Sequence, residues 1–178
     1  MDTLDDIQLM QRVQAGDQAA FSILVHRHQQ PLLNFFARLG AYTETEDLVQ
    51  ETLIRVFGYR QRYAPTAKFT TFLYTVARHV WIDRLRKIKR AEVWSEAYAA
   101  EAETAHDGDM ARLHARLDVD RALEQLPGKL RDVVVLAIFQ GLGYDEVAEI
   151  LDIPVGTVKS RMFLAMNNLR AFFDASNA

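Results

Sequence analysis

Apolar side chains recur at intervals of three and four residues along almost the whole chain, and this spacing constrains the fold more than any other feature. Such spacing places the apolar positions on one face of an α-helix. No run alternates apolar and polar residues long enough to predict a strand. The sequence therefore predicts an all-α protein. The clearest stripe consists of Phe21, Leu24, Val25, Leu32, Phe35, Phe36 and Leu39.

Capping residues divide this pattern into separate helices. Asp17 is expected to cap the N-terminus of a helix that ends at Gly40, and a short helix is expected before it around residues 7–13. Thr43 and Glu46 have the spacing of a capping box for a third helix. The other expected helices span residues 69–88, 117–126, 130–139, 144–151 and 155–173.

The net charge is only −3, but the charges are unevenly distributed along the chain. Residues 61–90 contain eight basic side chains and one acidic side chain, whereas residues 91–124 contain three and nine. The acidic stretch has no apolar stripe, and Gly108 interrupts any helix across it, which is typical of a flexible linker. The expected organisation is a helical domain at residues 1–91, an acidic linker at 92–114 and a second helical domain at 115–178.

The second domain contains a predicted helix-turn-helix motif. A short helix at 144–151 and a tight connection at 152–154 precede a longer helix. The inward stripe of the longer helix is Val155, Val158, Met162, Ala165 and Leu169. Side chains opposite the stripe, near the helix start, are placed where a recognition helix reads the major groove. These are Thr157, Lys159, Ser160 and Arg161. A helical hairpin that binds another protein has the same spacing.

The helix predicted from residue 69 ends in a basic cluster, which is expected to contact phosphate groups. Its members are Arg78, Arg84, Arg86, Lys87, Lys89 and Arg90, with Asp83 as the single acid among them. The adjacent acidic linker is expected to compete with phosphate for this cluster. Nearby aromatic residues either offer stacking platforms for unpaired bases or belong to the core. They are Tyr59, Tyr63, Phe69, Phe72, Tyr74 and Trp81.

Several function classes are disfavoured by what the sequence lacks. The chain has no cysteine, which excludes disulfides and thiolate metal sites, and we expect no metal or other cofactor. No glycine-rich phosphate loop, nucleophile elbow or ligand-spaced histidine pair predicts an enzyme. No apolar stretch approaches the roughly 20 residues of a membrane helix, and the acidic N-terminus is unlike a signal peptide. We therefore expect a cytoplasmic protein without membrane insertion.

Four segments, in this order, resemble the extracytoplasmic-function sigma factors of bacterial RNA polymerase, which are small members of the sigma-70 family. The segments are Gly16–Phe21, Glu46–Thr52, Lys68–Leu73 and Tyr144–Arg161. The resemblance covers nearly the whole chain apart from the linker. It implies a non-catalytic promoter-specificity subunit whose first domain binds core polymerase and opens the minus-ten element, and whose second domain reads the minus-thirty-five element as duplex. It also implies an anti-sigma factor that packs between the two domains.

The resemblance further implies roles for individual residues. The helix around Asp47 to Thr52 is similar to the surface that docks on the coiled coil of the polymerase's largest subunit. The implied core-polymerase contacts are Asp47, Gln50, Glu51 and Arg55. The loop at 60–68 and the face around His79 are similar to the family's single-strand reading site. With the basic cluster, the implied minus-ten contacts are Arg62, Lys68, Arg78, His79, Asp83, Arg84, Arg86, Lys87 and Arg90.

The chain departs from the family pattern at a few positions. The family commonly has Asn at the position of His79 and Trp at that of Phe72, so the identity of the base read does not transfer. Beyond Arg161 many relatives continue with basic residues, whereas this chain has Phe163 and Leu164, which either contact thymine methyl groups or pack on a partner protein. The alternative functions are a helix-turn-helix transcriptional regulator with an unrelated helical partner-binding domain, and a pure protein-interaction module.

Overall fold

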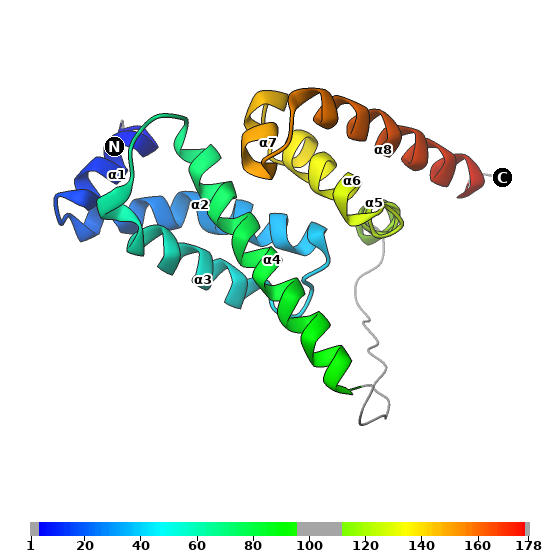
Figure 1. The fold of residues 1–178 in the computed structure, drawn as a ribbon, viewed down its shortest axis with the longest axis horizontal. Helices are drawn as coiled ribbons and strands as arrows, with labels where there is room; N and C mark the ends of the chain where they lie inside the picture. Colours follow the sequence, from blue (N-terminus) through cyan, green and yellow to red (C-terminus); the bar gives the residue numbers. More distant parts are fainter. Residues whose placement is uncertain (1–3, 96–111, 177–178) are drawn as a thin grey trace.

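The computed structural model describes the backbone of residues 4–95 and 112–176, and side-chain surroundings for residues 4–93 and 118–176. Within these ranges the chain is helical and contains no strand (Figure 1), which confirms the all-α prediction. The first unit comprises α1 (Asp6–Gln14), α2 (Gln18–Leu39), α3 (Thr45–Gly58), a 3-10 turn η1 (Arg60–Arg62) and α4 (Phe69–Ser95). The second comprises α5 (Arg112–Glu124), α6 (Gly128–Val134), the π-helical segment η2 (Val135–Phe139), α7 (Tyr144–Leu151) and α8 (Val155–Ser176).

The helix α2 is the central element of the first unit and has the ends that the sequence predicts. Asp17 accepts a hydrogen bond from the backbone N–H of Ala20 at 3.1 Å and so satisfies one free donor of the first turn. Gly40 ends the helix with φ +103°, a left-handed conformation that glycine adopts without steric cost. Between these ends, Leu32 and Phe36 are fully buried, and α2 packs against α1 and α3, with Phe35 against Tyr74 of α4.

The start of α3 differs from the sequence prediction. Thr43 and Glu46 do not form a capping box, because the helix begins at Thr45 and Glu44 occupies the cap position without a side-chain bond. The hydroxyl of Thr45 instead donates to the carbonyl oxygen of Ala41 at 3.1 Å. This bond ties the first turn of α3 to the connection from α2. The helix therefore begins where the connection places Thr45, and not at the position that the capping motif predicts.

The helix α4 is longer than its apolar stripe predicts. It continues past Ile88 to Ser95, through Lys89, Arg90 and Ala91, which are exposed. Lysine, arginine and alanine have high helix propensity, so the helix propagates without an apolar face. The expected linker at 92–114 therefore begins and ends in helix, and its central part lies outside the described residues, as do most of the acids expected to compete with phosphate.

The second unit contains the predicted helix-turn-helix. Its short helix α7 has the expected bounds, and Asp152 closes it in a left-handed conformation with φ +52°. In α8, Val158, Met162 and Ala165 are buried on the expected stripe. The helix expected at 130–139 instead begins at Gly128 and changes to π-helical hydrogen bonding at Val135.

The two units pack against each other, with α7 beside the N-terminal half of α4 and with α6 and η2 near α2 (Figure 1). Arg131 of α6 links the two units through hydrogen bonds to the C-terminal ends of α5 and α2. Its guanidinium donates to the carbonyl oxygens of Leu123 at 2.8 Å and Glu124 at 2.9 Å, and also to that of Leu39 at the end of α2 at 3.1 Å. A cation at helix C-termini satisfies free carbonyls and interacts favourably with both helix dipoles.

Candidate nucleic-acid and protein interfaces

The first candidate interface is the outer face of α3. Asp47, Gln50 and Glu51 are exposed there, as expected for contact residues. Arg55 is instead held between two carboxylates, with Nε 2.8 Å from Glu51 Oε1 and Nη1 2.8 Å from Asp83 Oδ2 of α4. The hydrogen bond from Arg55 lowers the pKa of Asp83 below its ordinary value. Arg55 therefore fixes α3 to α4. Of the other three predicted contacts, only Glu51 forms an ion pair with Arg55 in the described part of the chain.

An apolar groove lies next to these residues and was not recognised in the sequence. It is lined by Phe21, Gln50, Leu53, Ile54 and Phe57. Ile54 is 66% exposed, although it is a large aliphatic side chain. An exposed apolar patch with a polar rim is typical of a protein-binding surface. The available sequence signal was the position of Ile54, which falls outside the helical spacing of the other apolar residues of α3, Leu48, Val49, Leu53, Val56 and Phe57.

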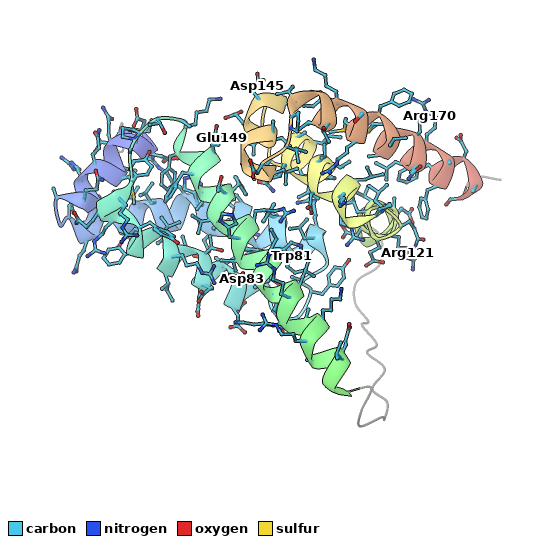
Figure 2. The ribbon with its side chains drawn as sticks, viewed as in Figure 1. Trp81, Asp83, Arg121, Asp145, Glu149 and Arg170 are labelled. Atoms are coloured by element: carbon cyan, nitrogen blue, oxygen red, sulfur yellow. The ribbon has the colours of Figure 1, made fainter. Side chains whose placement is uncertain are left out.

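The predicted minus-ten contacts on the first unit fall into two groups. The exposed group makes no ion pair within the described residues and consists of Arg62, His79, Lys87 and Arg90. The paired group is engaged by carboxylates of the same unit: Arg84 pairs with Glu44, and Arg86 Nη1 lies 3.8 Å from Asp83 Oδ1. Figure 2 shows Asp83 on the side of α4 toward α3 and Trp81 on the other side. The structure thus places Arg62 on η1 and distributes the other residues around α4.

Two further predicted minus-ten contacts, Lys68 and Arg78, face the second unit. Lys68 Nζ lies 3.3 Å from Glu146 Oε1 of α7, and the hydroxyl of Thr71 donates to the same oxygen at 3.4 Å. Arg78 Nη2 lies 3.0 Å from Asp132 Oδ2 of α6. Burial raises the pKa of Asp132, despite the opposing effect of Arg78. Both basic side chains therefore pair with acids from the other unit, Arg78 in a largely buried contact and Lys68 with its side chain 75% exposed.

Most of the aromatic residues near the basic cluster belong to the core. Tyr63, Phe69, Tyr74 and Trp81 are buried, and Phe72 is half-buried against the same core. A buried ring cannot stack on an unpaired base without rearrangement of the unit. The exception is Tyr59, which is exposed at the end of α3.

The helix α8 presents the predicted recognition residues on its open face. Lys159 and Ser160 are exposed, and Thr157 and Arg161 are half-buried. The hydroxyl of Ser160 donates to the carbonyl oxygen of Thr157 at 3.1 Å. The next exposed side chains are apolar, with Phe163 68% exposed and followed by Leu164 and Met166. Arg170 lies further along the same helix (Figure 2).

A groove of about 520 Å³ runs between α4 and α6. Its α4 wall is apolar and contains Trp81, Ile82, Leu85 and Ile88. Its other wall is charged and contains Lys129, Arg131 and Asp132, with Arg78 between the two walls. Such a groove fits an amphipathic segment better than a small polar ligand.

Other site types are not found in the part of the chain that the structure describes. Residues 4–93 and 118–176 contain no cluster of three metal-ligating side chains. No helix in the described ranges is long and apolar enough to cross a membrane. His28, the one buried histidine of these ranges, bonds Asp6 Oδ2 through Nε2 at 2.8 Å and ties α1 to α2, so its role is structural.

Comparison with known proteins identifies both units. The sigma-70 region 2 profile matches residues 24–91, and the sigma-70 region 4 profile matches residues 116–169. The chain is 35% identical over 173 residues to the ECF RNA polymerase sigma-E factors of Salmonella typhimurium and Escherichia coli, with 91% of this chain and 91% of each relative covered.

Two solved structures have the same fold. One is CnrH in complex with the cytosolic domain of CnrY, with a TM-score of 0.72 at 27% identity over 96% of this chain and 97% of that chain. The other is the sigma factor RpoE of Bartonella quintana in complex with the anti-sigma factor NepR, with a TM-score of 0.74 at 25% identity over 86% and 96%. The chain belongs to the extracytoplasmic-function group of the sigma-70 family and is an RNA polymerase sigma factor.

Proposed function

We propose that this chain binds core RNA polymerase and directs promoter-specific initiation, with the first unit opening the minus-ten element and the second reading the minus-thirty-five duplex. Sigma factors are initiation factors rather than enzymes, and no catalytic step is assigned to the chain. The observation that carries the proposal is the presence of region 2 and region 4 in one chain. A helix-turn-helix regulator with an unrelated partner domain has no reason to match region 2 over residues 24–91.

We place core-polymerase binding on the outer face of α3. The exposed carboxylates of Asp47 and Glu51 and the amide of Gln50 supply polar anchors, and Ile54 supplies an apolar anchor beside them. Interfaces of this kind combine a small apolar centre with a polar rim. Reversal of charge at Asp47 and Glu51 is expected to weaken binding, and Ile54→Ala is expected to weaken it without altering the net charge. Co-elution with core polymerase measures both effects, with Gln18→Ala on the exposed start of α2 as the control.

We place promoter contacts on α4 and α8. Lys87, Arg90 and Arg62 are exposed and suited to phosphate contacts, while His79 and Tyr59 are exposed on the same unit and suited to contact an unpaired base. On α8, Lys159 and Arg161 have the position and chemistry for guanine edges or phosphates of the duplex. Phe163 and Leu164 continue this surface.

We further propose an anti-sigma factor as the inhibitory partner, seated in the groove between α4 and α6. The groove combines an apolar wall with Lys129, while Arg78 and Arg131 beside it already bond Asp132 and backbone carbonyls, so the groove suits the apolar face of an amphipathic helix with a carboxylate that reaches Lys129. The Bartonella quintana relative is itself held by an anti-sigma factor. Replacement of Leu85, which is exposed in this groove, by Glu is expected to reduce capture of such a partner while leaving core binding intact.

Run-off transcription tests the main proposal. Purified core polymerase is incubated with a pool of genomic promoter fragments, with and without this chain. Transcripts that start at defined sites only when the chain is present support the proposal. Equal transcript patterns in both reactions, or failure to co-elute with core polymerase at moderate salt, contradict it.

A further inference from the structure

We propose that this structure is a closed state in which two carboxylates of the second unit, Glu146 and Asp132, occupy the DNA-contact positions of Lys68 and Arg78 on the first. We call these two contacts the interdomain latch. The proposal rests on the proposed function, because it assumes that α4 contacts the minus-ten strand. It assigns inhibition to the chain itself, before any partner binds.

The latch holds the N-terminal half of α4 at two points. At its first turns, Glu146 Oε1 lies 3.3 Å from Lys68 Nζ and accepts a bond from Thr71, which is almost fully buried. Two turns further on, Asp132 Oδ2 lies 3.0 Å from Arg78 Nη2. Between them, the hydroxyl of Tyr74 donates to the side-chain oxygen of Gln140.

Each carboxylate takes the place that a phosphate oxygen would occupy. Lysine and arginine bind carboxylates and phosphates with the same donors and the same charge. The side chain of Arg78 is only 20% exposed, so a strand that reaches it must displace Asp132, whereas Lys68 is 75% exposed and a strand there competes with Glu146 for the same ammonium group. Displacement of Asp132 also moves α6 away from α4, and displacement of Glu146 loosens the contact of α7 with α4.

The ion pair between Arg78 and Asp132 contributes little net free energy to the contact between the units. Arg78 is 20% exposed and Asp132 is 12% exposed, so the pair is largely removed from water. Nε and Nη1 of Arg78 are buried and make no hydrogen bond within the described part of the chain. A buried ion pair with unsatisfied donors regains little of its desolvation cost. The intact pair thus adds little net stability, whereas removal of the Asp132 carboxylate leaves Arg78 as an uncompensated charge between the units and favours their separation.

The test removes both carboxylate charges and keeps the shape of each side chain. In Glu146→Gln, the new amide oxygen still accepts the bond from Gly143 N–H that Glu146 now accepts at 2.8 Å, so α7 keeps its cap. Asp132→Asn preserves volume in the buried position. The matched control is Asp145→Asn with Asp174→Asn, which removes two exposed charges of the second unit that make no ion pair with α4.

Two readouts are needed. Because the chain has no cysteine, Gln11→Cys and Asn168→Cys allow a pair of labels on exposed positions of the two units, and the distance distribution between them reports opening. Binding of a short labelled single-stranded oligonucleotide of mixed sequence at low salt reports access to α4. We expect the latch variant to populate longer distances and to bind the oligonucleotide about tenfold more tightly than the control, because apparent affinity scales with the open fraction.

The outcomes separate the two proposals. An unchanged distance distribution overturns the latch, since the carboxylates then do not hold the units together. Longer distances with the oligonucleotide affinity of the control overturn it as well, because the covered surface is then not a DNA surface. Run-off transcription with the unaltered chain decides the proposed function separately. If that reaction fails while the latch variant opens and gains affinity, the latch stands as a control of nucleic-acid binding and the initiation role does not.

Discussion

Two helices, α4 and α8, both carry basic side chains, and their surroundings differ. On α4, Arg84, Arg78 and Arg86 are each paired with a carboxylate, whereas Lys87, Lys89 and Arg90 make no ion pair with any described residue. On α8, Lys159 and Arg161 make no ion pair within the described residues. The number of basic residues on a helix is therefore a poor measure of the unpaired positive charge that the helix offers to a ligand. The difference is that carboxylates pair with three arginines of α4, whereas the exposed Lys159 of α8 has no such partner in the described part of the chain.

The largest expected effect distinguishes Arg131, which bonds several carbonyl oxygens, from Arg161, which makes no ion pair within the described residues. Arg131→Met removes the donors to four carbonyl oxygens, three of them within the second unit. We expect it to lower the free energy of unfolding by about 3 kcal/mol, because charged hydrogen bonds to otherwise unsatisfied carbonyls are lost. Urea denaturation followed by circular dichroism measures the change. Arg161→Met is the control, and equal losses in the two variants would contradict the comparison.

The next effect concerns the open surface of α8. Lys159→Ala and Arg161→Ala should each weaken binding of the minus-thirty-five duplex by about 1 to 3 kcal/mol if the side chain contacts a base edge. A base-edge contact also relaxes specificity at one position, whereas a phosphate contact weakens all sequences alike. Selection of binding sites from a random duplex pool separates the two. Unaltered promoter use by both variants would show that the orientation of α8 proposed here is wrong.

A smaller effect separates the paired and unpaired parts of α4. Lys87→Ala and Arg90→Ala should each reduce the slope of log affinity against log salt for single-stranded DNA by about 1, because each phosphate contact releases condensed counterions. Arg84→Ala should change the slope less, since Glu44 already neutralises Arg84. A titration series at increasing salt gives the slopes. Equal reductions of the slope for Arg84→Ala and Arg90→Ala would contradict this prediction, because they would mean that the pairing of Arg84 with Glu44 does not hinder its contact with phosphate.

The smallest expected effect is a dependence of stability on pH through Asp132. Burial raises its pKa in the folded chain, against the opposing charges of Arg78, Arg131 and Arg161 that face it. The folded state then binds the proton more tightly than the unfolded state, so stability falls as pH rises from about 4, the ordinary pKa of aspartate, through the raised value. The difference in denaturation midpoint between the unaltered chain and Asp132→Asn isolates this contribution. A difference that is constant with pH would contradict it.

Local patterns were sufficient for most helix bounds. Asp17 and Gly40 cap α2 as predicted, and the spacing from Val158 to Ala165 correctly defines the buried face of α8. These features depend on neighbours within one helix, so the local sequence is sufficient to predict them. The start of α3 could not be predicted in the same way, because Thr45 bonds a carbonyl of the preceding connection and no capping box forms.

The all-α class, the two helical units and the family membership follow from the sequence by itself, since apolar periodicity and ordered motifs are properties of the chain. Which of the basic residues are available was decided only by the tertiary structure. Lys68 lies 78 positions before Glu146, and Arg78 lies 54 before Asp132, so no local spacing relates them. Their pairing depends on how α6 and α7 dock on α4, and that docking is set by packing over the whole interface.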